Sequence, residues 1–152
     1  MNRFLFLILS TALLLPACSP RAAEGTERIE VRDAWSRPAP QGGNGAVYFV
    51  IENQTSDRHE LIGAASDIAQ AVEIHESTMD GDVMQMHHMP SVSLAPGAGV
   101  TFEPGGLHIM LIGLQQELKE GDDFEVTLQF RDFEEIRIQV PVQSAPASED
   151  PH

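Results

Sequence analysis

The sequence predicts an all-β domain, an antiparallel β-sandwich or a Greek-key barrel. Eight or nine short segments alternate apolar and polar residues or form brief apolar runs, and Gly, Pro, Asn and Asp separate them. No segment shows a long period of 3.6 residues. This many short strands in about 115 residues is typical of two packed antiparallel sheets. The expected strands are residues 29–35, 45–53, 60–66, 71–78, 83–89, 99–104, 107–114, 123–130 and 135–142.

The expected strands show two kinds of residue pattern. Residues 123–130 and 135–142 place apolar residues at alternate positions throughout, as a half-buried strand does, and residues 29–35 and 71–78 do so in part. The segments around residues 45–53, 60–66 and 107–114 are apolar runs, which is typical of strands covered on both faces. Only residues 66–71 are expected to form as much as one helical turn.

The two ends of the chain are expected to lie outside this domain. Residues 1–17 combine a basic start with an apolar run and read as a secretion signal. The motif LPAC at residues 15–18 resembles a bacterial lipobox, which predicts either a lipidated Cys18 or cleavage nearby by an ordinary signal peptidase. Residues 18–28 read as a tether, 29–142 as the folded domain and 143–152 as a disordered tail. The mature protein is therefore expected to be exported, and a lipidated Cys18 would anchor it to a membrane.

The charge excludes some partners. The formal net charge is −14 at pH 7, so we expect no nucleic-acid binding and membrane contact only through an N-terminal lipid. An acidic surface attracts cations or basic partners. The alternative explanation is that the acidic residues only keep an exported protein soluble. Cys18 is the only cysteine, so no disulfide and no thiolate are expected inside the domain.

Histidine and methionine are concentrated in one third of the chain. Every methionine except the first lies between Met79 and Met110, and four of the six histidines lie between His75 and His108. Methionine is usually a flexible core filler, and a lone histidine is usually structural. Neither role predicts this confinement, so the pattern indicates a metal site.

A hairpin is expected to organise the candidate ligands. Asp80-Gly81 between two strand-like segments predicts a type I′ turn, and this register places His75 opposite Met86. Met84 and His88 then share the face of Met86, whereas His87 and Met89 point to the other face. In a later strand, His108 and Met110 are two residues apart and share a face.

These donors predict the identity of the metal. Two imidazoles and two thioethers, from His75, Met86, His108 and Met110, form a neutral soft set that suits Cu(I) better than Zn, Mg or Ca. Blue-copper sites require a cysteine thiolate, so an electron-transfer cupredoxin is disfavoured. No catalytic constellation is apparent, and we expect no enzyme. A second, weaker copper site would use Met84, His87, His88 and Met89 as ligands, and Cu(II) is a candidate ion for it.

The spacing resembles the PCuAC family of periplasmic copper chaperones. Ten residues separate His75 from Met86, twenty-one separate Met86 from His108, and Met110 completes a His-x-Met motif. AWSRP at residues 34–38, GAVYFVIEN at 45–53, DGDVMQM at 80–86 and PGGLHIMLIGL at 104–114 also match. The likeness runs from Ile29 to Val142. His87, His88 and Met89 depart from the family pattern, because relatives usually have a non-ligand there.

The resemblance implies a fold and a function. It implies a cupredoxin-like β-sandwich that binds one Cu(I) near its surface through the four residues named. It further implies delivery to a respiratory haem–copper oxidase, at its CuA site or a related centre, with a Sco-type thioredoxin-fold copper protein and the oxidase copper subunit as partners. The alternative is a copper-buffering or tolerance protein that uses the additional His and Met residues to bind more than one copper. A metal-free interaction domain is the remaining class.

Overall fold

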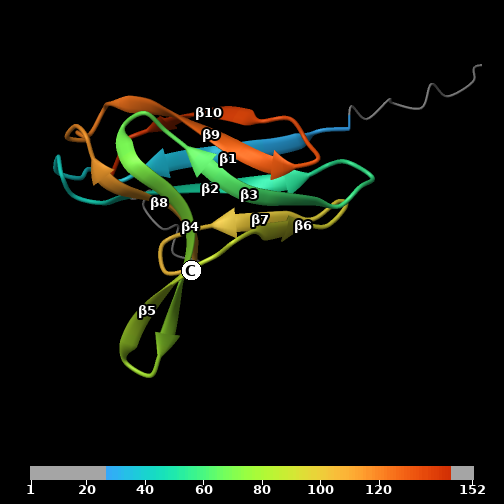
Figure 1. Ribbon diagram of the computed structural model, residues 1–152, viewed down its shortest axis with the longest axis horizontal. Coiled ribbons are helices and arrows are strands. Elements are labelled where there is room, and N and C mark those ends of the chain that lie inside the picture. Colours follow the sequence, from blue (N-terminus) through green and yellow to red (C-terminus); the bar gives the residue numbers. More distant parts are fainter. Residues whose placement is uncertain (1–26, 145–152) are drawn as a thin grey trace, which may run out of the picture.

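The computed structural model describes residues 27–144 and is an antiparallel β-sandwich, which confirms the predicted fold class (Figure 1). The signal peptide, Cys18, most of the tether and nearly all of the predicted tail lie outside the described residues. Within residues 27–144 no helix is long and apolar enough to cross a membrane.

Two sheets form the sandwich. The larger sheet has the order β1-β2-β8-β4-β5, and β7 also pairs with β2. Its strands are β1 (Ile29–Ser36), β2 (Gly45–Asn53), β4 (Ala69–Asp80), β5 (Val83–His88), β7 (Gly99–Phe102) and β8 (Leu107–Leu114). The smaller sheet has the order β10-β9-β3-β6. Its strands are β3 (His59–Ala65), β6 (Val92–Leu94), β9 (Asp123–Arg131) and β10 (Ile136–Pro141). The chain passes repeatedly from one sheet to the other, so neighbouring strands are often distant in sequence.

One local expectation was wrong, and one short strand was missed. Residues 66–71 form no helical turn; β4 begins at Ala69, whose buried side chain lies opposite Leu114 of β8. Six residues are too few to nucleate a stable helix, whereas each strand residue gains ladder hydrogen bonds and burial. The three-residue strand β6 was not expected, because three residues show no clear alternation.

The alternation of side chains decides which residues face the core. In β9 the residues Phe124, Val126, Leu128 and Phe130 are buried, in strict alternation with more exposed neighbours. In the larger sheet the core-facing row consists of Val47, Ile109 and Ile74, paired across β2, β8 and β4. The residues next to them in each strand therefore point to the outer face of this sheet.

A hydrogen-bonded asparagine stabilises the end of β2. Asn53 is fully buried, and its side-chain amide donates to the carbonyl groups of Asp57 at 2.7 Å and Leu94 at 3.0 Å. Its Oδ1 accepts hydrogen bonds from the backbone N–H and the hydroxyl of Thr55. These bonds join the loop after β2 to β6 in the opposite sheet and satisfy a buried polar group that would otherwise be costly.

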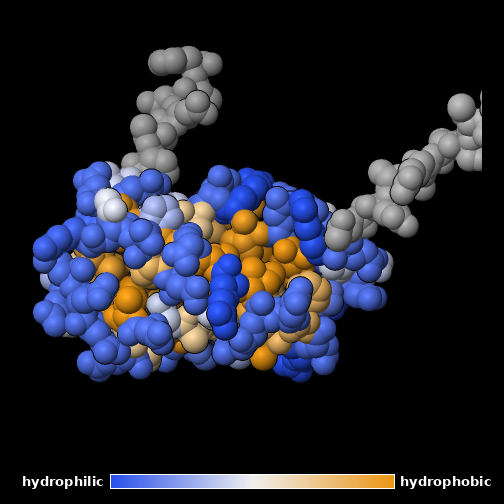
Figure 2. All heavy atoms as spheres, turned by 90° about the horizontal axis from the view of Figure 1, so that it is seen from above, coloured by the Kyte–Doolittle hydropathy of each residue, from blue (hydrophilic) through white to orange (hydrophobic). Residues whose placement is uncertain are grey.

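The hairpin formed by β4 and β5 extends beyond the body of the sandwich (Figure 1). Seen from above, the surface of the molecule has hydrophobic residues surrounded by hydrophilic ones (Figure 2). Among the described residues, the exposed large hydrophobic side chains are Ile62, Met79, Val83, Met84 and Met86. All of these except Ile62 lie on the hairpin. Such a concentration of exposed apolar groups on one projecting element is typical of a functional surface.

Candidate metal site

The hairpin is built on a different turn from the one expected. Asp80 pairs with Val83, so the two central turn residues are Gly81 and Asp82. Gly81 has φ of 62°, whereas the non-glycine residues with positive φ in the described chain are Asp33 and Asp132. A single glycine with positive φ at the first central position is characteristic of a type II′ turn, whereas the expected type I′ turn requires positive φ at both.

With the observed turn, the pairing of the two strands differs from the expected register by two residues. His75 lies opposite His88, and Met86 lies opposite Ser77. The expectation that His75 and Met86 face each other was therefore wrong. A shift of two residues leaves every side chain on its original face, because the side-chain period of a strand is two. Met84, Met86 and His88 consequently still share one face of the hairpin, as expected.

Four of the predicted donors meet at one pocket of about 430 Å³. Met84 and Met86 come from β5, and His108 and Met110 come from β8. Met86 is 49% exposed, whereas His108 is only 4% exposed. The pocket therefore has a buried imidazole from β8 and exposed thioether groups from β5.

His75 lies beside this pocket, next to His108. The two residues pair directly across β4 and β8, and their ring centroids are 6.0 Å apart. His88 is on the other side, with its ring centroid 5.9 Å from that of His75. A row of three imidazoles therefore crosses β5, β4 and β8 on the outer face of the larger sheet.

Hydrogen bonds orient two of these imidazoles. His108 Nδ1 lies 3.1 Å from the carbonyl oxygen of Gly106, which identifies Nδ1 as the protonated donor and leaves Nε2 with a lone pair. Burial lowers the pKa of His108, because the charged form loses hydration; the Gly106 carbonyl opposes this and raises the pKa. His108 therefore favours the neutral form that can bind a metal.

Glu73 interacts with the other imidazole, and its role was not anticipated. His75 Nε2 lies 2.7 Å from Glu73 Oε2, and this hydrogen bond is the main cause that lowers the pKa of Glu73. The other ring nitrogen, His75 Nδ1, is buried without a hydrogen-bond partner. The i, i+2 spacing of Glu73 and His75 on a strand was a usable signal, since it places both on one face.

Aromatic residues flank the pocket on the β2 side. Tyr48 lies on it and has its ring centroid 6.5 Å from that of His108. Trp35 packs on Tyr48 at 4.8 Å, and the Arg37 guanidinium lies 5.8 Å from the Trp35 ring centroid. Sequence reasoning did not assign these residues to the site, although Trp35 and Arg37 lie in the AWSRP motif.

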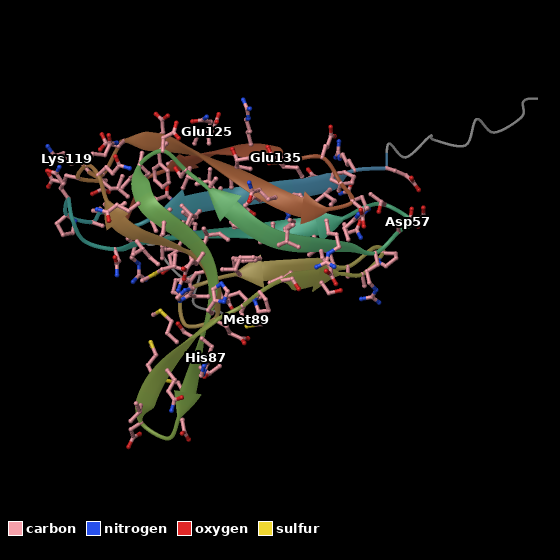
Figure 3. All side chains as sticks on the ribbon, viewed as in Figure 1. Asp57, His87, Met89, Lys119, Glu125 and Glu135 are labelled. Atoms are coloured by element: carbon pink, nitrogen blue, oxygen red, sulfur yellow. The ribbon has the colours of Figure 1, made fainter. Side chains whose placement is uncertain are left out.

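The proposed secondary ligands do not gather in one place. His87 pairs with Glu76 on the opposite face of the hairpin, and Met89 is partly buried against the hydrophobic core. Figure 3 shows Met89 where the hairpin joins the sandwich and His87 further along the hairpin. Of that set, only Met84 lines the pocket with Met86, and only His88 adjoins His75.

The donor types restrict the metals that this region could bind. Within residues 27–144, no three His, Cys, Asp or Glu side chains are grouped so that they could hold a metal ion. Binding of one ion by three or more of these described side chains would therefore have to include thioether sulfur, a soft neutral ligand that favours Cu(I). A larger pocket of about 560 Å³ is lined by residues such as Asp67, Glu125 and Arg137 and contains no His or Met.

Two kinds of sequence comparison identify relatives. The family model described as "LpqE-like: Putative lipoprotein LpqE-like" matches residues 29–142. "Putative lipoprotein Lxx21020" of Leifsonia xyli subsp. xyli (strain CTCB07) is 31% identical over 133 residues, which cover 87% of this chain and 80% of the relative. "Uncharacterized protein RP573" of Rickettsia prowazekii (strain Madrid E) is 34% identical over 113 residues, which cover 71% of this chain and 62% of the relative.

Solved structures show the same fold. The copper-bound PCuAC domain from PmoF2 is 25% identical, with a TM-score of 0.65 and coverage of 76% of this chain and 92% of that domain. The Cu(I) form of DR1885 from Deinococcus radiodurans is 23% identical, with a TM-score of 0.62 and coverage of 80% and 84%. The cupredoxin-like β-sandwich expected from the sequence is therefore confirmed.

Proposed function

Since the chain belongs to the LpqE-like family and has the fold of PCuAC domains, as its motifs predicted, we propose that it is an exported Cu(I) metallochaperone. In this role the protein carries copper and does not catalyse a reaction. Copper is the cargo, and its ligands are proposed to be His75, Met86, His108 and Met110.

The observation that carries this proposal is the meeting of Met86, His108 and Met110 at one pocket, with His75 paired directly to His108. Met86 is more than twenty residues from His108 in the chain, so this proximity comes from the fold and not from local sequence. All four donors are uncharged when they bind metal. A neutral set with thioether sulfur stabilises the monovalent ion and disfavours Zn and Ca.

The exposure of the site suits transfer. Met86 is 49% exposed on a projecting hairpin, whereas His108 is buried in the sheet. An incoming thiolate could displace the exposed thioether first, while the imidazole in the sheet still holds the ion. Stepwise ligand exchange of this kind would move copper between proteins without releasing it into solution.

We propose that the recipient is a respiratory haem–copper oxidase. Delivery would go to its CuA site or a related centre through the oxidase copper subunit and a Sco-type thioredoxin-fold copper protein. Dithiol sites of such partners bind Cu(I) more tightly than thioethers do, because thiolates carry charge. A periplasmic location with lipid attachment at Cys18 would keep the carrier at the membrane surface.

Anaerobic competition titration with a Cu(I) chelator tests the function. We expect one tight equivalent, and X-ray absorption of the loaded protein should count both sulfur and nitrogen neighbours. Mixing the loaded protein with a reduced Sco-type protein should then transfer copper. A chain that binds no Cu(I) in the presence of a weak competing chelator, or a spectrum without sulfur neighbours, would contradict the proposal.

A copper buffer is the second candidate. It is favoured by the additional donors beside the site, since Met84 lies on the same pocket and His88 adjoins His75. A buffer should bind several equivalents with graded affinities, whereas a carrier should bind one tightly. The same titration, continued beyond one equivalent, distinguishes the two functions.

A further inference from the structure

We propose that Glu73 is a positioning residue whose carboxylate holds His75 in the Nε2–H tautomer, so that Nδ1 is the nitrogen that binds Cu(I). The inference rests on the proposed copper-carrying function and adds to it the roles of Glu73 and of each ring nitrogen. Two independent features of the structure support it: the contact made by Nε2 and the isolation of Nδ1.

The Glu73 carboxylate engages Nε2 directly. Its Oε2 lies 2.7 Å from His75 Nε2, a short distance that is typical of a charge-assisted hydrogen bond. A carboxylate can only accept here, so the neutral imidazole carries its proton on Nε2. Glu73 pairs with Met110 and His75 pairs with His108 across β4 and β8, so the carboxylate lies on the same face as both β8 donors.

The other nitrogen is a buried acceptor without a partner. In the Nε2–H tautomer, His75 Nδ1 carries a lone pair, and this atom is buried without any hydrogen-bond partner. Leaving such a group unpaired lowers the stability of the folded state, because the atom loses its hydration and gains no hydrogen bond in return. Proteins tolerate this cost mainly where the group has a function, and a metal ligand is one such function.

His108 is arranged in the opposite sense. Its Nδ1 donates to the Gly106 carbonyl at 3.1 Å, so Nε2 is the nitrogen available to the ion. Each histidine is therefore fixed through one nitrogen, and the two rings would bind copper through different atoms. A carboxylate or carbonyl behind a metal-binding imidazole fixes its tautomer and orientation, and losing it typically weakens metal binding about 10- to 100-fold.

The chain offers a matched control. Glu76 lies on the same strand but on the opposite face, where it pairs with His87 of β5 and Leu107 of β8. Replacing Glu76 removes the same charge from the same hairpin without touching His75 Nε2. If only the lost negative charge mattered, the Glu73 and Glu76 variants should therefore lose the same copper affinity.

The first experiment is anaerobic Cu(I) competition titration of Glu73→Ala, Glu73→Gln and Glu76→Ala. We expect about 10- to 100-fold weaker binding for Glu73→Ala and a smaller loss for Glu73→Gln, whose amide oxygen can still accept from Nε2–H. Glu76→Ala should bind as the wild type does. Equal affinity in Glu73→Ala and Glu76→Ala would overturn the proposal.

The second experiment reads the tautomer by ¹⁵N NMR of the histidine rings. In the metal-free wild type, His75 should carry its proton on Nε2, and Glu73→Ala should show a mixture of tautomers. In the Cu(I)-loaded wild type, Nδ1 should show the metal-induced shift; a shift at Nε2 would overturn the proposal while leaving the carrier function intact. If the wild type bound no Cu(I), the proposed function would fail, and the metal-free spectrum would still test the Glu73–His75 tautomer.

Discussion

His75 and His108 are directly paired across β4 and β8, with ring centroids 6.0 Å apart. Both belong to central strands of the larger sheet, whereas Met86 belongs to the edge strand β5 of the projecting hairpin. The sheet therefore fixes the imidazoles relative to each other, and the hairpin supplies thioether sulfur from one side.

Loss of a proposed ligand should weaken Cu(I) binding without unfolding the domain. We expect Met86→Ala and His108→Ala each to lower affinity by more than the roughly 10- to 100-fold typical of residues that only support a ligand. His87→Ala is the control, because His87 lies on the other face of the hairpin. Chelator competition, with circular dichroism to monitor folding, measures the effect. Wild-type affinity in both ligand variants would show that the ion binds elsewhere.

Met84 and Met79 provide a matched test of the pocket. They lie opposite each other on the hairpin and are about equally exposed, at 60% and 61%, but only Met84 lines the pocket. Met84→Leu should weaken Cu(I) binding by about tenfold, the lower end of the range for supporting residues of metal sites. Met79→Leu should have no effect. If both variants lose affinity equally, the general apolar character of the hairpin matters, and the pocket does not.

Gly81 should control the stability of the hairpin. Its φ of 62° is unfavourable for residues with a side chain, although a Cβ atom there would meet nothing within 4 Å. Gly81→Ala should therefore strain the turn by about 1–3 kcal/mol and accelerate hydrogen exchange of the β5 amides. The midpoint of global unfolding should change little, since the hairpin extends beyond the sandwich.

Gly99 in β7 is the control for this variant, because its φ is not positive. A Cβ atom there would lie 3.4 Å from the Glu52 side chain, so Gly99→Ala should leave the β5 amides unchanged. Unchanged β5 exchange in Gly81→Ala would argue against the type II′ turn.

Asn53 should be important for global stability. Replacement by Ala would remove the side-chain partner of the buried Thr55 N–H and of the Leu94 carbonyl, whereas the Thr55 hydroxyl could still donate to the Asp57 carbonyl. Unpaired buried groups typically cost about 1–3 kcal/mol each, so we expect a loss of at least about 2 kcal/mol in urea unfolding. The neighbouring Gln54→Ala, at an exposed position, should cost less than about 0.5 kcal/mol.

Much of the strand layout could be predicted from the sequence. The alternation in β9, where Phe124, Val126, Leu128 and Phe130 are buried, is visible in the residues themselves. The same period of two predicts that His108 and Met110 share a face. Both inferences depend only on neighbours along one strand, and strand geometry fixes those relations whatever the partner strand does.

The hairpin register could not be predicted in the same way. Asp80-Gly81 and Gly81-Asp82 are both favourable hairpin dipeptides. The first, as a type I′ turn, requires positive φ at Asp80 and Gly81, whereas the second, as a type II′ turn, requires it only at Gly81. In the folded protein, Ser77 N–H donates to the Gly106 carbonyl and Met89 N–H donates to the Ile74 carbonyl. These bonds connect the hairpin to the residue before β8 and to its own base, and they are not apparent in the turn sequence.

The amino-acid sequence by itself determined the alternation of the strands, the class of the fold and the soft, neutral character of the donors, since these follow from residue type and local spacing. Only the tertiary structure decided that Met86 faces Ser77, that His75 adjoins His108, and that Glu73 engages Nε2 and leaves Nδ1 without a partner. The physical reason is that these contacts join residues whose relative positions depend on strand register and ring orientation. Register and orientation are set by hydrogen bonds and packing across the whole sheet.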